Sequence, residues 1–223
     1  MNVMNLLYLI LIILYATLPP ISLFYSQKLI YNDKNKYGVH IHYLVKYLST
    51  LLFIPILFIP SINLAIIPQR GWSVVFLVLT FLLAALGVGR AIKRKGMFFY
   101  FGGVSAAFME ELLYRSVIFG LSLSIWSNQW IALIVSSFLF GTWHLKNYYW
   151  SGKRSIIIQF FYTALFYGPI FALMRVYTGD IYLGILFHFL TDATCALAPD
   201  WTRGWLVHGG KGGNYSDNVL PKA

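Results

Sequence analysis

The sequence predicts an all-α membrane protein, a single bundle of about seven transmembrane helices. Hydrophobic residues make up 59% of the 223 residues and charged residues only 11%, whereas soluble domains carry about 25% charged residues. The apolar residues gather in runs of roughly the 20 residues that a membrane-spanning helix needs. A soluble enzyme and a nucleic-acid-binding domain are therefore excluded, although the net charge is +10.

Each apolar run is expected to form one spanning helix. The runs are residues 4–25, 48–68, 72–91, 97–123, 129–145, 155–176 and 181–199. Pro19 and Pro20 interrupt the first run, which we expect to kink or end there. Residues 1–200 then form one transmembrane domain, followed by a polar C-terminal tail at 201–223.

Lysine and arginine in the connections predict the orientation in the lipid bilayer. Counted along the chain, the successive connections and the tail hold 4, 1, 4, 0, 3, 1 and 3 of these residues. Basic residues accumulate on the cytoplasmic side, next to anionic lipid headgroups. The alternation therefore predicts a multi-pass protein with its N-terminus outside and its C-terminus in the cytoplasm.

Two adjacent glutamates, Glu110 and Glu111, lie near the middle of the fourth run. A charged residue at the bilayer centre costs about 2.5–3.5 kcal/mol on insertion scales. Arg115 follows Glu111 by four residues, so the two share a helix face and can pair. Glu110 points about 100° away and lacks a local partner, which suits a general base. The alternative is a buried salt-bridge cluster that only holds helices together.

Two further runs carry ionisable residues. His144 ends the fifth run, four residues after Phe140, and His188 and Asp192 share one face of the seventh. Convergence on one pocket is the simplest way to satisfy all these groups. We expect this pocket in the inner half of the bilayer, open to the cytoplasm.

These residues resemble the motifs of the CPBP family, which comprises CAAX prenyl endopeptidases and bacteriocin-processing or immunity proteins and is also called the Abi family. The resemblance covers about residues 97–199, which are expected to be the catalytic core. The three motifs are Glu110-Glu111-x-x-x-Arg115, Phe140-x-x-x-His144 and His188-x-x-x-Asp192. The order of all three, each in an apolar helix, makes the resemblance specific.

The resemblance implies an intramembrane protease and a role for each motif residue. Glu110 would activate water with the help of His144, and Glu111 and Arg115 would be the supporting pair. Phe140 would shape the pocket. The expected substrate is a peptide bond in a membrane-anchored peptide or protein, and the expected location is the cell membrane.

The last motif departs from the best-known pattern of the family. His188 and position 192 would stabilise the oxyanion of the tetrahedral intermediate. The prenyl endopeptidases carry asparagine at the last position, which donates a hydrogen bond, whereas Asp192 donates one only when protonated. The alternative is that Asp192 orients His188, so the role of Asp192 stays open.

The residues leave other functions open. Histidines with carboxylates can bind zinc, but the chain has no His-Glu-x-x-His motif, so we favour a glutamate–histidine mechanism without a cofactor over a zinc-dependent protease. A non-catalytic bacteriocin-immunity or peptide-binding protein would keep the same pocket. A proton-coupled carrier is a more distant alternative, because no repeat pair is visible.

Overall fold

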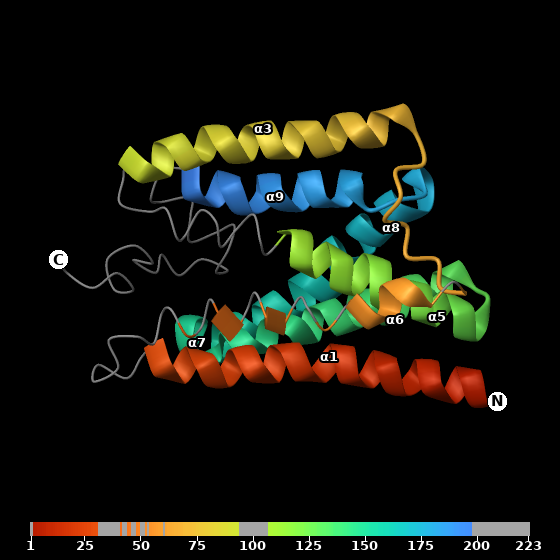
Figure 1. Ribbon diagram of the computed structural model, residues 1–223. Helices are drawn as coiled ribbons and strands as arrows, with labels where there is room; N and C mark the ends of the chain where they lie inside the picture. The colour runs from red at the N-terminus through yellow and green to blue at the C-terminus, as the bar shows by residue number, and fades with distance from the viewer. Residues whose placement is uncertain are drawn as a thin grey trace.

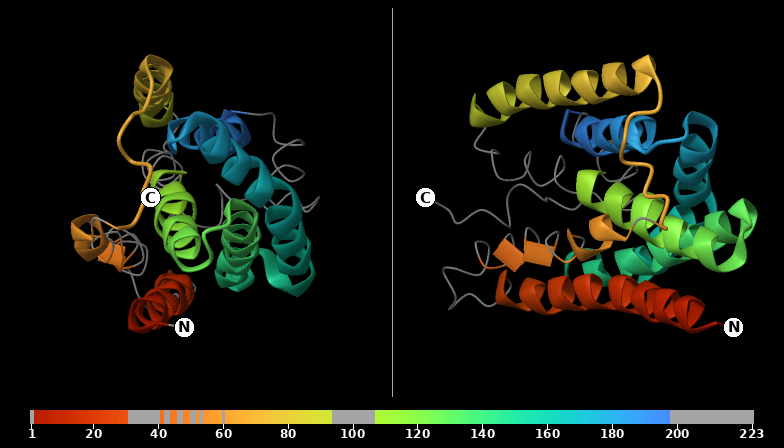
Figure 2. Two further views of the ribbon diagram at one scale, coloured as in Figure 1. Left: turned by 90° about the vertical axis from the view of Figure 1, so that its right-hand side faces the viewer. Right: turned by 45° about the vertical axis from the view of Figure 1, so that its right-hand side comes forward.

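The computed structural model is a bundle of helices (Figure 1). It describes residues 2–30, 41, 44–45, 48–49, 52, 54–59, 61–93 and 107–197, and every regular element within these ranges is a helix. The long helices α1 (Val3–Ile30) and α3 (Gly71–Lys93) lie at opposite edges, with the other helices between them (Figure 2). The predicted all-α class is confirmed.

Two long helices of the centre each contain a π-helical segment. The central elements are η2 (Leu112–Ile118), α5 (Phe119–Trp126), α6 (Gln129–Trp143), η3 (His144–Asn147), α7 (Tyr148–Tyr162), η4 (Thr163–Tyr167), α8 (Gly168–Thr178) and α9 (Tyr182–Leu197). Residues 107–126 run through η2 as one continuous helix, and residues 148–178 run through η4 as another. Such π segments are rare and are often found at functional sites.

Helix α1 continues through Pro19 and Pro20 to Ile30, so of the two expected outcomes, a kink or an end at the prolines, the end is wrong. Each proline removes one backbone hydrogen bond, a loss that helices packed in a membrane tolerate when neighbouring groups compensate. The hydroxyls of Tyr8 and Tyr15 reach Ser61 and the Leu52 carbonyl on the following segment. These contacts hold α1 against the rest of the chain.

The second predicted span, 48–68, is not one helix. Its described part holds the short 3₁₀ helix η1 (Ile54–Phe58) and then an irregular segment at 61–70. Pro68 cannot donate a backbone hydrogen bond, and Ala65 takes a positive φ of 53°, which a helix does not allow. The apolar composition of this run therefore does not make it a spanning helix.

The irregular segment is held by side chains of the neighbouring helices. Arg175 donates from Nη2 to the Asn63 carbonyl at 2.5 Å and from Nη1 to the Ser116 carbonyl at 3.2 Å. The Ser116 hydroxyl donates to the Leu64 carbonyl at 2.5 Å. At Gly120 an added Cβ would lie only 2.7 Å from the Asn63 oxygen, so glycine permits this close approach. Irregular backbone in a membrane protein requires such internal partners.

Asp180 joins the irregular segment to two helices. Its carboxylate is fully buried and accepts hydrogen bonds from the Gln69 and Tyr182 backbone N–H groups, each at 3.2 Å. It also accepts the hydroxyl hydrogen bond of Ser73, in the first turn of α3. The starts of α3 and α9 are thereby fixed to each other, and these helices pack along their lengths.

The bundle carries apolar side chains outside and charged side chains inside. Exposed hydrophobic residues line α1 and α3, and they include Ile10, Ile13, Leu14, Leu18, Val74, Val75, Val78, Phe81 and Leu82. Glu111, Arg115 and Asp180 are fully buried. A large exposed apolar surface indicates contact with a membrane or a protein partner. Charged side chains within membrane segments face the interior of the bundle.

Two described helices, Val3–Ser26 and Ile156–Thr178, are long and apolar enough to cross a membrane, and Gly71–Leu83 and Tyr182–Thr191 are shorter apolar helices. The count of seven spans and the orientation stay predictions. The connection expected at 146–154 is helical instead, since η3 leads directly into α7. Residues 97–106 of the fourth run and the tail at 201–223 lie outside the described residues.

Replacement of Asp180 tests this junction. Asp180→Ala leaves the Ser73 hydroxyl and the Gln69 and Tyr182 N–H groups without their acceptor, and one buried unsatisfied group costs about 1–3 kcal/mol. We expect a free energy of unfolding lower by about 3 kcal/mol or more, measured by equilibrium unfolding in mixed micelles. Asp180→Asn keeps one acceptor oxygen and should lose clearly less. Equal stability of the alanine variant and the unmodified protein would contradict this role.

Candidate active site

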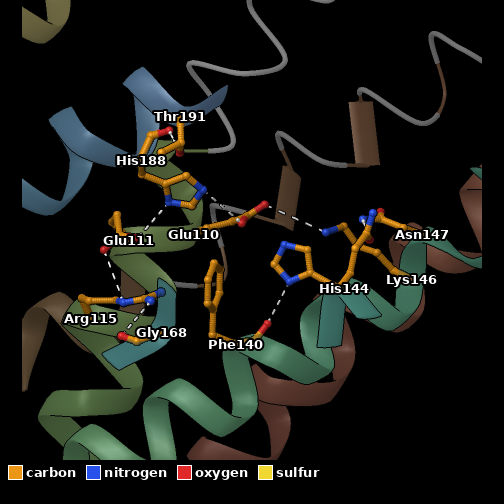
Figure 3. Close-up of polar contacts among 11 residues, drawn as sticks. Glu110, Glu111, Arg115, Phe140, His144, Lys146, Asn147, Gly168, His188 and Thr191 are labelled. Atoms are coloured by element: carbon orange, nitrogen blue, oxygen red, sulfur yellow. Dashed lines mark hydrogen bonds and ion pairs between the residues drawn. The ribbon is translucent and has the colours of Figure 1, made fainter. Parts of the chain in front are cut away.

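The two adjacent glutamates lie at the point where the helix over 107–126 changes to a π-helix. Glu110 and Glu111 are the last residues before η2, and both are buried, with exposed fractions of 6% and 0%. Figure 3 shows their carboxylates pointing into one polar cluster that also receives side chains from α6, η3 and α9.

Glu111 has a basic partner at each of its two oxygens. Its Oε2 lies 3.4 Å from Nε of Arg115, one turn later on the same helix. Its Oε1 lies 2.8 Å from Nδ1 of His188. A carboxylate oxygen only accepts, so Nδ1 of His188 carries the proton. Arg115 also donates from Nη2 to the Gly168 carbonyl at 3.3 Å. Glu111 therefore joins helix 107–126 to α9, and Arg115 joins it to α8.

Two phenylalanines enclose the charged groups. The guanidinium carbon of Arg115 lies 4.1 Å above the ring of Phe140 and 5.2 Å from that of Phe171. The ring of His188 stacks on Phe171 at 5.1 Å, and Phe140 meets the rings of His188 and His144 edge-on at 5.8 and 4.9 Å. Contacts between cations and aromatic faces stabilise charge where water is scarce. Phe171 carries no motif that the sequence could have revealed.

Glu110 meets two basic side chains from other elements. Its Oε2 lies 3.6 Å from Nε2 of His188, and its Oε1 lies 3.9 Å from Nζ of Lys146. Both of these contacts come from distant parts of the chain. From the sequence alone, Lys146 is one of the basic residues of the connection predicted at 146–154. Its position two residues after His144 is the signal that could have found it.

His144 begins η3 and lies beside Glu110 and Lys146. Its Nδ1 is 3.0 Å from the Phe140 carbonyl, which can only accept, so this nitrogen carries the proton. The other ring nitrogen is then free to accept a proton in the neutral imidazole. Figure 3 shows that nitrogen turned toward the Glu110–Lys146 pair. A water molecule between this nitrogen and Glu110 could donate a hydrogen bond to each of them.

The structure thus brings together all the predicted site residues except one. Asp192 lies in α9, one turn after His188, but its side chain is outside the described residues. Glu111 makes an orienting contact on His188. What Asp192 contributes stays a prediction.

Within the part of the chain that the structure describes, no three His, Cys, Asp or Glu side chains gather as a group that could hold a metal ion. Glu111 is already paired with Arg115 and His188, so a metal would compete with these partners. The groups present, two carboxylates and two imidazoles beside two cations, are suited to proton transfer.

Comparison with known proteins gives one match. The family model described as Type II CAAX prenyl endopeptidase Rce1-like matches residues 70–194, more than half of the chain. The matched residues contain α3 and every element of the polar cluster. No curated protein and no solved structure matches the chain.

A glycine one turn before His188 gives a test of the cluster. An added Cβ at Gly184 would lie 3.0 Å from Oε2 and 3.6 Å from Cδ of Glu111. Because Arg115 and His188 hold this carboxylate, it cannot easily move away. We expect Gly184→Ala to lower the free energy of unfolding by about 1–3 kcal/mol, as overpacking does, measured in mixed micelles. Gly71→Ala is the control, since nothing lies within 4 Å of its added Cβ. Equal effects of the two changes would contradict the argument.

Proposed function

Because the chain belongs to the Rce1-like type II CAAX prenyl endopeptidase family, which is the CPBP family, we propose that it is an intramembrane endopeptidase of the glutamic type. Its substrate is a membrane-anchored peptide or protein, cleaved within or near the bilayer. The observation that carries this proposal is the pair of adjacent buried glutamates with different partners. Glu111 is held by Arg115 and His188, and Glu110 faces His144 and Lys146.

The proposed reaction begins with a water molecule bound between Glu110 and His144. Glu110 takes a proton from this water, and the resulting hydroxide attacks the carbonyl carbon of the scissile peptide bond. As the tetrahedral intermediate collapses, the carbon–nitrogen bond breaks and the proton passes from Glu110 to the departing amine. The products are a carboxylic acid and an amine, with no group consumed. General acid–base catalysis of this kind contributes about 10²–10⁴-fold to a rate.

Stabilisation of the oxyanion is assigned to His188, together with residue 192. Glu111 accepts the hydrogen bond from Nδ1 of His188 at 2.8 Å, which orients the ring. A protonated ring donates from Nε2 as well, and this nitrogen faces Glu110 at 3.6 Å. An oxyanion formed beside Glu110 would therefore meet a donor that is already oriented.

The proposal includes a multi-pass protein of the cell membrane with the site facing the cytoplasm. The N-terminus, the α5–α6 turn and the α8–α9 turn lie at one end of the bundle, and the end of α3, η3 and the end of α9 lie at the other (Figure 1). Lys146 and the basic residues at the start of α7 lie at this second end. Basic residues favour the cytoplasmic side, which supports a cytoplasmic position for the end that holds His144.

Cleavage by purified protein in micelles tests the proposal. We expect the unmodified protein to cleave members of a panel of membrane-anchored peptides, with and without prenyl groups, and to resist a strong chelator. Glu110→Ala and His144→Ala should each lower the rate by about 10²-fold or more, because each removes a proton-transfer group. Asp217→Ala and His208→Ala, in the predicted tail, are the matched controls and should keep the rate.

Each other outcome favours a different function. Cleavage that a chelator abolishes would favour a zinc-dependent protease. Folded protein that cleaves nothing in the panel but binds peptides would favour the bacteriocin-immunity or peptide-binding alternative. Cleavage that survives Glu110→Ala would overturn the proposed mechanism.

A further inference from the structure

Lys146 places a buried ammonium group at the site without belonging to any of the three motifs. Its side chain is about one-tenth exposed. The ammonium nitrogen lies 3.9 Å from Oε1 of Glu110 and 3.8 Å above the ring of Trp143. A buried charge is costly unless it is compensated, and here both a carboxylate and an aromatic face compensate it.

The two oxygens of Glu110 thus face positively charged or chargeable groups on different elements. Oε2 faces His188 on α9, and Oε1 faces Lys146 on η3. An attraction at one oxygen alone would leave the carboxylate free to rotate about its last bond. Attraction at both oxygens fixes its plane, and Figure 3 shows His144 beside the oxygen that Lys146 faces.

We propose that Lys146 is a positioning residue for the reaction. It holds the carboxylate of Glu110 so that Oε1 points to the water that His144 also binds. The inference rests on the proposed function, and it adds to the three motifs a residue that acts through Glu110 rather than on the substrate. A general base displaced by about 1 Å can lose about 10²-fold in rate.

Trp143 supports the position of the ammonium. Its ring is fully buried and packs edge-on against Tyr114 at 6.0 Å. A ring fixed in the core offers its face at a constant position, and a cation over an aromatic face is attracted to it. Lys146 is thereby restrained by Trp143 as well as by Glu110.

A purely structural role for Lys146 predicts different behaviour. A contact that only joins η3 to helix 107–126 would, when lost, lower the stability of the fold and change substrate binding and turnover together. A positioning role predicts a loss in kcat with little change in KM, because the carboxylate is misplaced only for the chemical step. It also predicts that arginine, which keeps the charge, restores most of the rate.

The test compares three variants of the full chain in micelles. We expect Lys146→Gln to lower kcat by about 10- to 100-fold with KM within about twofold of the unmodified protein. Lys146→Arg should stay within about threefold of the unmodified rate, because the charge remains near Glu110 and a guanidinium also stacks on an aromatic ring. Lys153→Gln is the matched control, since Lys153 is exposed on α7, and it should change neither constant.

The outcomes separate this inference from the proposed function. If the unmodified protein cleaves and a folded Lys146→Gln variant keeps the full kcat, the positioning role is wrong while the protease proposal stands. If the unmodified protein cleaves nothing, the proposed function fails and the role of Lys146 in it fails as well. If Lys146→Gln does not fold, the arginine variant decides. A folded Lys146→Arg variant that loses 100-fold in kcat would contradict the inference that the positive charge of residue 146 positions Glu110.

Discussion

The rest of the site depends on the contacts of the Glu111 carboxylate, which is fully buried and lies between Arg115 and His188. A charge in this surrounding is stable only when opposite charge and hydrogen bonds surround it. Those partners come from the same helix and from α9, and Arg115 passes the contact on to the Gly168 carbonyl in α8. This carboxylate therefore links helix 107–126 to α9 and, through Arg115, to α8.

The position of Glu110 follows from that of Glu111. Adjacent residues on a helix point about 100° apart, so once Glu111 is turned toward α9, Glu110 is turned toward the end of α6. There it meets His144, whose ring is oriented by the Phe140 carbonyl. Two chemically identical side chains thus acquire different roles through their neighbours. Arg115 lies in the π-helical segment η2, which begins directly after the two glutamates.

Much of the site could be predicted from the sequence, because its contacts are partly local. The spacing of four residues sufficed for the Glu111–Arg115 pair, and composition sufficed for the all-α class. The contact of Glu111 with His188 spans 77 residues and depends on how α9 packs, which no local pattern encodes. The part of the second predicted span at 61–68 is irregular, although its apolar residues resemble those of a spanning helix. Its carbonyls are satisfied by side chains such as that of Arg175, which lies over 100 residues away. Lys146 was missed because basic residues near helix ends usually serve orientation.

The central claim is that Glu110 performs chemistry and Glu111 holds the structure. The most direct measurement compares Glu110→Gln with Glu111→Gln, determining both the free energy of unfolding and the cleavage rate in micelles. We expect Glu110→Gln to lose cleavage but clearly less stability than Glu111→Gln, because the partners of Glu110 lie farther away, at 3.6 and 3.9 Å. We expect Glu111→Gln to lose about 3–5 kcal/mol of stability, as breaking a buried ion pair does. Equal stability losses in both variants, or cleavage retained in Glu110→Gln, would contradict this claim.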